Sequence, residues 1–268
     1  MTTKLQIAKL EATGNDFLVT LDPDAPSLSD EIVTLLCDRH CGIGADGLIT
    51  VGPGRNGADC TMALRNADGS AAEMSGNGIR CLAWVATRAG LGTEHELIVD
   101  TAAGRRTIAL VRDPAGEVIA AEVDMGPVVI DDDDTSITVH GIDYRGRVAN
   151  IGNPHFVTFV DDPDTTRVTT HGPIIERDLQ FPNGANVEFV RVDGPATLTM
   201  RVWERGAGET LSCGTGACAA AAVANARGLV GDTVCMHVRG GDLDIALGET
   251  VRLGGPVAHV FDMDVEVS

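Results

Sequence analysis

The chain has 268 residues, of which 44% are hydrophobic and 3% are aromatic, enough for two ordinary cores built mostly from Val, Leu, Ile and Ala. Its formal net charge is -19 at pH 7 and its pI is about 4.5. This charge argues against nucleic acid and against an anionic membrane surface as partners, because both require a basic face.

Strands and helices alternate through the first half of the chain. Residues 5–10 and 17–21 are expected to form strands joined by a Gly-Asn-Asp turn, and residues 30–37 have helical spacing. Asp30, which follows Ser29, is the expected N-cap of that helix. The other expected elements are strands at 61–66, 97–99, 107–111 and 118–123, a turn at 66–69, and a helix at 79–89 closed by Gly90.

The same order returns in the second half. The expected elements are strands at 148–151, 186–192 and 198–203, a helix at 217–227 closed by Gly228, and an alternating tail at 257–267. A strand runs into Gly126-Pro127 and then into the acid run Asp131 to Asp134, which is typical of an exposed turn. The domain change is therefore placed near residues 124–127.

Two short motifs recur at one fixed spacing. Gly-Asn at 14–15 returns at 152–153, and the Ser-Gly-Asn-Gly at 75–78 has its counterpart in the Cys-Gly-Thr-Gly at 213–216. The subtractions 152 minus 14 and 213 minus 75 both give 138. The shared offset predicts two like-folded halves, residues 1–123 plus 257–268 and residues 124–256. Halves that face each other would present matched groups to opposite faces of one ligand, the geometry that inversion of a carbon centre requires.

Cys213 stands directly before a Gly-x-Gly at the expected start of a helix. The first backbone N–H groups of a helix have no internal partner and carry partial positive charge, so they favour a thiolate and can lower a cysteine pKa from ~8.5 to about 3.5–7.5. Glycines let a ligand approach the backbone closely. A substrate carboxylate between two such helix ends could accept N–H hydrogen bonds from both, which would stabilise the enolate-like charge that grows on it when the adjacent Cα–H is removed.

The lysines argue against a pyridoxal phosphate enzyme. Lys4 and Lys9 are the only lysines, both fall in the first expected strand, and neither lies in a Gly/Ser-rich phosphate loop. If this chain inverts an amino-acid centre, we expect it to use no cofactor, with one side chain as base and another as acid.

These motifs together resemble those of the diaminopimelate epimerases, cofactor-independent enzymes of lysine and cell-wall precursor synthesis. The most specific stretch is Glu-Arg-Gly-Ala-Gly-Glu-Thr at 204–210, which leads to the Cys-Gly-Thr-Gly at 213–216. The resemblance covers nearly the whole chain in order, through the further segments 14–17, 39–47, 66–70, 76–81, 152–155 and 186–189.

The resemblance implies an α/β fold of two pseudo-symmetric domains, each a mixed or antiparallel β-sheet wrapped around a central α-helix, with the active site in the cleft between them. It also implies two cysteines, one per domain, that exchange roles as base and acid. By motif position these are Cys213 and residue 75, but residue 75 is serine. A hydroxyl is a much weaker acid than a thiol, so Ser75 is a poor base, and serine is also a natural helix cap.

Three explanations of Ser75 stay open. It is an engineered Cys-to-Ser change that traps substrate or prevents a disulfide with Cys213, or a natural variant with weakened or one-sided proton transfer. Alternatively, it marks a relative repurposed for elimination, which needs a single thiolate. In each case we expect this chain to be a poor epimerase.

The resemblance assigns roles to further residues. The distal amino-acid end of the substrate would be bound by Asn66, Asn153, Asn186 and Arg205, whose amide and guanidinium groups suit an ammonium and a carboxylate. Glu204 would lie near the reacting α-amino group, His155 beside the thiol pair, and Asn15 in the same pocket. The α-carboxylate would be received by the backbone N–H groups of Gly76, Asn77, Gly214 and Thr215.

The seven cysteines are odd in number and unevenly spaced, unlike a secreted disulfide framework, so we expect a cytoplasmic protein. We find neither an export signal nor an apolar run of about 18 residues. Cys37, His40 and Cys41 have no second cluster of ligands at the usual spacing, so no metal is expected. The cysteines other than Cys213 are expected to be structural, and the resemblance implies a homodimer.

Three functions compete. The first is interconversion of LL- and meso-diaminopimelate, the second a cofactor-independent racemase of another amino acid such as histidine, and the third a non-catalytic amino-acid binding protein that has lost a base at Ser75. Arg205 and the asparagines favour a substrate with a second charged end. Cys213 lies in a complete motif, which favours catalysis over binding alone. The sequence leaves open the exact substrate, the oligomeric state and whether the domains are open or closed.

Overall fold

The computed structural model describes residues 3–21 and 28–267. The chain separates into two compact units: unit 1 is Met1–Val123 with Gly255–Ser268, and unit 2 is Asp124–Gly254. The sequence placed these boundaries after residues 123 and 256, whereas the structure has the second one after residue 254.

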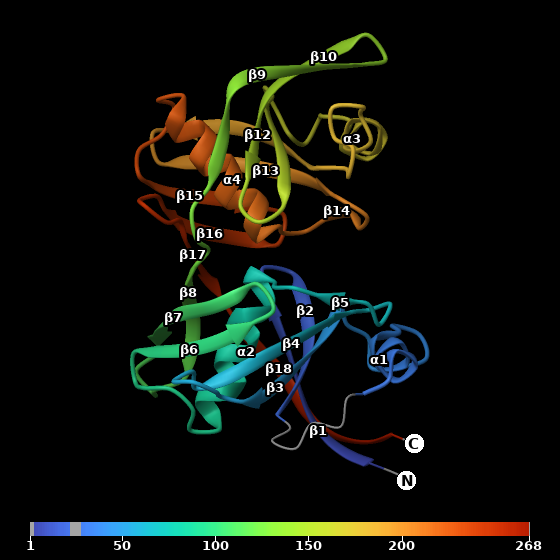
Figure 1. The fold of residues 1–268 in the computed structure, drawn as a ribbon, viewed down its shortest axis with the longest axis vertical. Coiled ribbons are helices and arrows are strands. Elements are labelled where there is room, and N and C mark those ends of the chain that lie inside the picture. The colour runs from blue at the N-terminus through green and yellow to red at the C-terminus, as the bar shows by residue number, and fades with distance from the viewer. Residues whose placement is uncertain (1–2, 22–27, 268) are drawn as a thin grey trace. The chain divides into compact units, whose positions relative to one another are not determined.

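Unit 1 is built mainly of strands, with one short and one long helix (Figure 1). Its elements are β1 (Thr3–Ala12), β2 (Asn15–Leu21), α1 (Asp30–Cys37), β3 (Gly47–Pro53), β4 (Cys60–Asn66), β5 (Ala71–Ala72), α2 (Gly76–Arg88), β6 (Glu96–Thr101), β7 (Gly104–Arg112), β8 (Val118–Asp124) and, from the C-terminus, β18 (Ala258–Val267).

Unit 2 repeats this order of elements after one additional strand (Figure 1). Its elements are β9 (Val129–Val139), β10 (Ile142–Asn150), β11 (Pro154–Phe159), α3 (Val168–Glu176), β12 (Asn186–Gly194), β13 (Thr197–Glu204), β14 (Gly208–Thr210), α4 (Gly214–Ala226), β15 (Thr233–Val238), β16 (Gly241–Ala246) and β17 (Arg252–Pro256).

The strand pairings of the two units correspond one to one. In unit 1, β1–β2, β3–β4, β4–β5, β6–β7 and β7–β8 are antiparallel, whereas β2–β3 and β4–β6 are parallel. In unit 2, β10–β11, β12–β13, β13–β14, β15–β16 and β16–β17 are antiparallel, whereas β11–β12 and β13–β15 are parallel. One more antiparallel strand flanks each sheet, β18 beside β1 and β9 beside β10. The predicted repeat of one α/β fold is confirmed.

Each sheet wraps around one central helix, as predicted. Helix α2 packs against β1, β2, β3 and β4, and helix α4 packs against β10–β13, β15 and β16. Most residues of both helices are buried, and α4 consists largely of alanine. A helix that is apolar on all sides is suited to a buried position, and its small side chains allow the surrounding strands to approach closely.

Both central helices begin earlier than their hydrophobic pattern indicates. The sequence predicts starts at residues 79 and 217, whereas the helices begin at Gly76 and Gly214. The difference arises because the preceding side chains, Ser75 and Cys213, cap the helices and extend them through glycines that carry no hydrophobic signal.

The cap of α1 also differs from the sequence-based prediction. Ser29, not Asp30, is the N-cap, and its Oγ accepts a hydrogen bond from the Ile32 N–H at 3.4 Å. Asp30 is the first helical residue, and its carboxylate forms an ion pair with Arg65. Asp30 therefore ties the helix start to β4 instead of capping it.

The acid run at 131–134 lies inside strand β9, so the predicted turn is wrong, although residues 131–133 are exposed as expected. The antiparallel pairing with β10 is irregular within this run: Ile130 pairs with Ala149, and the ladder resumes with Asp134 opposite Arg147. Asp134 also accepts hydrogen bonds from Arg145 and Arg227. These arginines offset the negative charge of Asp134, where the pairing resumes.

The C-terminal strand completes unit 1. Besides the pairing of β18 with β1, the ring of His259 stacks on Trp84 of α2 with the ring centroids 4.5 Å apart. Within residues 3–21 and 28–267, no helix combines the length and the apolar character needed to cross a membrane.

Candidate active site

The two central helices begin with the same local geometry. Ser75 Oγ accepts a hydrogen bond from the Gly78 N–H at 3.0 Å, and Cys213 Sγ accepts one from the Gly216 N–H at 3.4 Å. Both capping residues have extended backbone. Each cap satisfies the third N–H of its helix, so the first two N–H groups have no partner within the helix. These two groups belong to the residues predicted to receive an α-carboxylate: Gly76 and Asn77 in unit 1, Gly214 and Thr215 in unit 2.

The third helical position of both helices leaves little space for a side chain. A Cβ atom on Gly216 would lie 2.6 Å from Glu188 Oε1 and 3.2 Å from Cys213 Sγ. A Cβ atom on Gly78 would lie 3.0 Å from Ile49 Cδ1. The space that a larger residue would fill is therefore occupied, and in unit 2 it is occupied by the groups of the candidate site itself.

A buried arginine organises the start of α2. Arg80 Nη2 donates hydrogen bonds to Asn77 Oδ1 at 2.9 Å and to Thr13 Oγ1 at 3.1 Å. Its Nη1 donates to the Gly76 carbonyl at 2.9 Å, and its Nε donates to the Pro256 carbonyl at 3.1 Å. These acceptors compensate the guanidinium for its loss of water. The Asn77 side chain thus belongs to this network, while its backbone N–H is the second of α2.

The turn before β2 has an unusual backbone. Thr13 has a φ of 50° and Gly14 a φ of 79°, which fits the two-residue type I′ hairpin between β1 and β2. For a β-branched residue such a conformation costs roughly 1–3 kcal/mol, which the hydrogen bonds of Thr13 with Asn77 and Arg80 help to offset. Asn15, a predicted pocket residue, follows the turn, and its buried Oδ1 has no hydrogen-bond partner among the residues described.

Two carboxylates surround the thiol of Cys213. Glu204 shares a side-chain hydrogen bond with Cys213 and accepts another from Thr210 Oγ1. Burial raises the pKa of Glu204 above its ordinary value. Glu188 is fully buried on β12, and in the described part of the chain its Oε2 has no hydrogen-bond partner. Both groups add negative potential at the sulfur.

A chain of side-chain contacts links Glu188 to the thiol through His155. Glu188 Oε1 lies 2.7 Å from His155 Nδ1, and His155 Nε2 lies 2.9 Å from Asn153 Oδ1. Asn153 Nδ2 then donates to Thr215 Oγ1 at 3.4 Å, and Thr215 Oγ1 lies 3.5 Å from Cys213 Sγ. Both ring nitrogens of His155 face oxygen atoms, so contacts with Glu188 and Asn153 hold the ring on two sides.

The surroundings of Cys213 oppose ionisation of its thiol. Burial raises the pKa of Cys213 well above its usual value, and the charges of Glu204 and Glu188 raise it further. Hydrogen bonds with Thr215 and with the Gly216 N–H act in the opposite direction. The helix start favours the thiolate through the Gly216 N–H, as expected, but desolvation and two carboxylates outweigh this effect.

The residues predicted to bind the distal end of a substrate are engaged in local contacts. In unit 1, Asn66 Nδ2 donates to Ser70 Oγ at 3.0 Å. In unit 2, Asn186 Nδ2 donates to the Pro154 carbonyl at 3.0 Å, and its Oδ1 accepts from the Arg205 N–H at 2.9 Å. The Arg205 side chain is exposed. Their roles as substrate contacts stay predictions.

The structure gathers the predicted residues into two half-sites. The half-site of unit 1 is the start of α2 with Ser75, Gly76 and Asn77, and the half-site of unit 2 comprises Asn153, His155, Glu204, Cys213, Gly214 and Thr215. Sequence reasoning missed four residues of these networks: Thr13, Arg80, Glu188 and Thr210. The sequence does offer one signal for Glu188: it is the one charged residue in the apolar strand segment 187–190. A carboxylate buried in such a strand needs a partner.

The chain is similar to known proteins along most of its length. A family model described as diaminopimelate epimerase matches residues 7–130 and 147–258. The chain is 41% identical to the diaminopimelate epimerase of Desulfitobacterium hafniense, over 96% of each chain. It is 40% identical to that of Synechocystis, over 98% of this chain and 99% of the relative.

Solved structures show the same fold at lower identity. A hydroxyproline epimerase from Agrobacterium vitis matches with a TM-score of 0.76 and 18% identity, over 98% of this chain and 93% of that chain. A phenazine biosynthesis protein from Bacillus anthracis matches with a TM-score of 0.73 and 16% identity, over 98% of this chain and 99% of that chain. With the half-sites and the sequence relatives, these likenesses lead to one assignment: the chain belongs to the diaminopimelate epimerase family.

Proposed function

We propose that this chain interconverts LL- and meso-2,6-diaminopimelate by cofactor-independent proton transfer at Cα, in lysine and peptidoglycan precursor synthesis. The relatives at about 40% identity carry that name, and they do not favour a racemase of another amino acid such as histidine. The observation that carries the proposal is the identical capping geometry of Ser75 and Cys213 at the two central helices. Each cap is adjacent to two backbone N–H groups that suit a carboxylate.

The α-carboxylate of the substrate would accept hydrogen bonds from the first N–H groups of both helices. These are the groups of Gly76 and Asn77 and of Gly214 and Thr215. Negative charge moves onto this carboxylate as the Cα–H is removed, so donors fixed in advance by two helix starts stabilise the transition state more than the ground state. The buried Asn15 Oδ1 supplies an additional acceptor for the ammonium end.

Glu204 is the group we propose to ionise the thiol. It already shares a hydrogen bond with Cys213, and its raised pKa makes it a better base than an exposed carboxylate. The Cys213 proton passes to Glu204, which leaves a thiolate and a neutral acid in place of a thiol and a carboxylate. The substrate ammonium and the imidazole of His155 then counter the remaining charge of Glu188.

At the opposite position Ser75 limits the reaction. A hydroxyl is a much weaker acid than a thiol and is rarely ionised, so Ser75 is a poor base. The chain as it stands is therefore a weak epimerase. Arg205, Asn66, Asn153 and Asn186 would bind the distal ammonium and carboxylate, which requires local contacts such as the Asn66–Ser70 hydrogen bond to be exchanged for contacts with substrate.

The test is an epimerase assay on purified full-length chains, with each diaminopimelate isomer supplied separately and the products resolved by chiral chromatography. Ser75→Cys is expected to raise the rate of interconversion by about 10²–10⁴-fold, the usual contribution of a positioned acid or base. Cys41→Ser, which changes an exposed cysteine outside both half-sites, is expected to leave the rate of either background unchanged. Failure of the Ser75→Cys chain to act on either isomer would reject the function.

The same assignment carries two further proposals. We propose a homodimer, supported by the exposed apolar side chains of Val260 and Phe261 on β18, which are 53% and 38% exposed. We also propose a cytoplasmic location, supported by the seven free cysteines, because thiols persist in a reducing compartment. Sedimentation velocity would test the dimer, and a doubled mass that is lost in Phe261→Asp would support this interface.

A further inference from the structure

We propose that unit 2 carries a second site, a Zn²⁺ site formed by Cys235, His237 and Asp242 on the hairpin of β15 and β16. One potential ligand atom from each residue, a sulfur, a ring nitrogen and a carboxylate oxygen, lies within 4.8 Å of the other two. Thiolate, imidazole and carboxylate are the three ligand types that zinc takes in proteins. None of the three residues belongs to the half-sites at α2 and α4.

The register of the hairpin brings these side chains to one face. Cys235 and His237 are two residues apart on β15, so their side chains point to the same side of the sheet. Across the antiparallel ladder His237 pairs with Asp242, and Cys235 pairs with Asp244. Directly opposite residues share a face, so the ladder itself positions the sulfur, the imidazole and both carboxylates without any loop.

One contact already holds two of the potential ligands together. His237 Nδ1 lies 2.7 Å from Asp242 Oδ1, which orients the ring on the carboxylate. The side chains of His237 and Asp242 are 44% and 64% exposed, so an ion can enter directly from solvent. Three protein ligands and one water complete the four-coordinate arrangement that zinc adopts.

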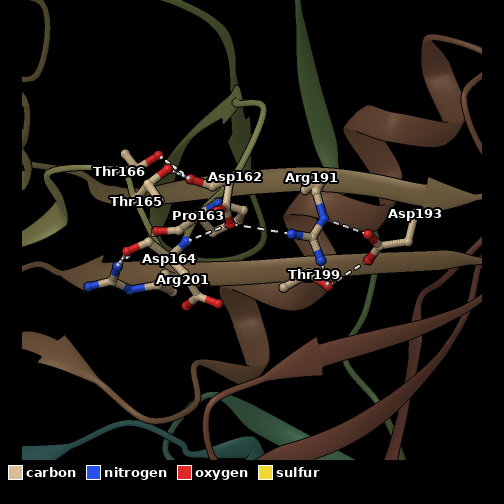
Figure 2. A network of polar contacts seen from close by, with 9 residues as sticks. All are labelled: Asp162, Pro163, Asp164, Thr165, Thr166, Arg191, Asp193, Thr199 and Arg201. Carbon is tan, nitrogen blue, oxygen red and sulfur yellow. Dashed lines mark hydrogen bonds and ion pairs between the residues drawn. The ribbon is translucent and has the colours of Figure 1, made fainter.

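The electrostatic surroundings favour a cation. Besides Asp242, the carboxylates of Asp244 and Asp193 act on this cluster, the first on Cys235 and the second on His237. Figure 2 shows that Arg191, on strand β12, which β13 separates from β15, points between Asp162 and Asp193. Arg191 Nη1 lies 3.3 Å from Asp162 Oδ1, and Arg191 Nε lies 2.5 Å from Asp193 Oδ1. The two carboxylates offset the positive charge of Arg191, which reduces its repulsion of a metal ion.

Binding at this site exchanges a proton for the metal. The Cys235 thiol loses its proton to solvent, the sulfur binds Zn²⁺ as thiolate, and the His237 nitrogen binds as a neutral donor in place of its contact with Asp242. The net reaction releases one proton from the thiol and consumes no redox partner. The ion would cross-link β15 and β16 and stabilise the hairpin that follows α4.

The experiment uses the full chain with Zn²⁺ alone as the probe. Chelator-treated protein is titrated with Zn²⁺ in a calorimeter, and bound metal is counted by atomic absorption after gel filtration. We expect one Zn²⁺ per chain at this site, its loss in Cys235→Ser, and affinities reduced at least roughly 10-fold in His237→Gln and Asp242→Asn, since even an outer-sphere partner contributes 10–100-fold. With Co²⁺ in place of Zn²⁺, we expect a thiolate-to-metal absorption band that Cys235→Ser lacks.

The matched control is Cys41→Ser, which removes an exposed thiol next to another histidine, His40. This variant is expected to retain the ion and the cobalt band. Circular dichroism of the metal-free proteins verifies that each variant is folded, and added Zn²⁺ should raise the unfolding temperature of the parent and of Cys41→Ser but not of Cys235→Ser. Unchanged Zn²⁺ affinity in Cys235→Ser, or a cobalt band that depends on Cys41, would overturn the proposal.

Discussion

The starts of α2 and α4 have the same backbone and different chemistry. In both, the capping side chain accepts a hydrogen bond from the third helical N–H, across a glycine that no larger residue can replace without displacing a neighbour. Cys213 lies among Glu204, Glu188 and the His155 chain of contacts, whereas the network next to Ser75 is built on Arg80, Asn77 and Thr13. The comparison shows that the fold repeats a capping side chain at the start of each central helix, and that the side chains around the two caps differ.

Removal of the thiol is expected to have the largest effect. Cys213→Ser leaves two hydroxyls at the capping positions, so we expect α-proton exchange and epimerisation to fall by about 10²–10⁴-fold from the already low rate of the parent chain. Serine preserves the cap, so the circular dichroism spectrum should not change. Deuterium uptake by diaminopimelate in deuterated water, read by mass spectrometry, checks the loss. Exchange that continues at the parent rate would remove Cys213 from the mechanism.

A mirrored chain sharpens the comparison. The double variant Ser75→Cys, Cys213→Ser places the only capping thiol on α2, and we expect it to exchange the α-proton of the isomer that the parent chain leaves untouched. Its rate should be about 10-fold or more below that of Ser75→Cys alone, because one capping thiol is missing. The measurement is isomer-resolved deuterium uptake. The same isomer preference in the parent and mirrored chains would contradict equivalent roles for the two helix starts.

The rate of α-proton exchange is expected to depend on pH through Cys213 and Glu204. Because burial and the neighbouring carboxylates raise the pKa of Cys213, the reactive thiolate becomes more abundant as pH increases, and we expect the exchange rate to rise through and beyond the ordinary range of a thiol. Glu204→Gln removes the proposed proton acceptor and should lower the rate by about 10²-fold while steepening its rise with pH. Rates measured from pH 6 to pH 10 in both chains check this. A parallel profile in the two chains would count against Glu204 as that acceptor.

The smallest expected effect concerns stability rather than chemistry. Asp16 follows the Thr13 turn. Burial raises its pKa, but hydrogen bonds and ion pairs with Arg39 at 2.5 Å and Lys9 at 2.8 Å outweigh burial and lower the pKa to about 2. A carboxyl with a lowered pKa stabilises the folded state above its ordinary value of 3.8, and this contribution is lost as pH falls toward 2. Asp16→Asn should cost about 1–2 kcal/mol in the free energy of unfolding at pH 7. Urea titrations at pH 7 and pH 3 should show the difference shrinking at the lower pH.

Much of the fold could be predicted because its signals are local and repeated. The offset of 138 residues relates the two central helices, and the alternating segments locate many of the strands. Helix α3 was not predicted because Gly172 and Pro173 interrupt its pattern. The acid run at 131–134 was misassigned because its arginine partners, including Arg227, are distant in sequence and meet it only in the folded unit.

The candidate site was predicted less completely than the fold. Residues in short motifs, such as Cys213 and Glu204, could be found from their order along the chain. Glu188 and Arg80 act through burial, which one sequence does not display. The raised pKa of Cys213 has the same origin, because the helix N-terminus is a local feature, whereas the desolvation that outweighs it arises from packing of the whole unit.

One measurement tests the central claim most directly. The parent chain is incubated in deuterated water with LL- or meso-diaminopimelate, and deuterium at Cα and configuration are read together by chiral chromatography and mass spectrometry. With a single capping thiol, we expect one isomer to gain deuterium with its configuration retained and the other to gain almost none, while Ser75→Cys labels both with inversion. Equal labelling of both isomers by the parent chain, or labelling that survives Cys213→Ser, would contradict an account in which the two helix starts deliver the protons.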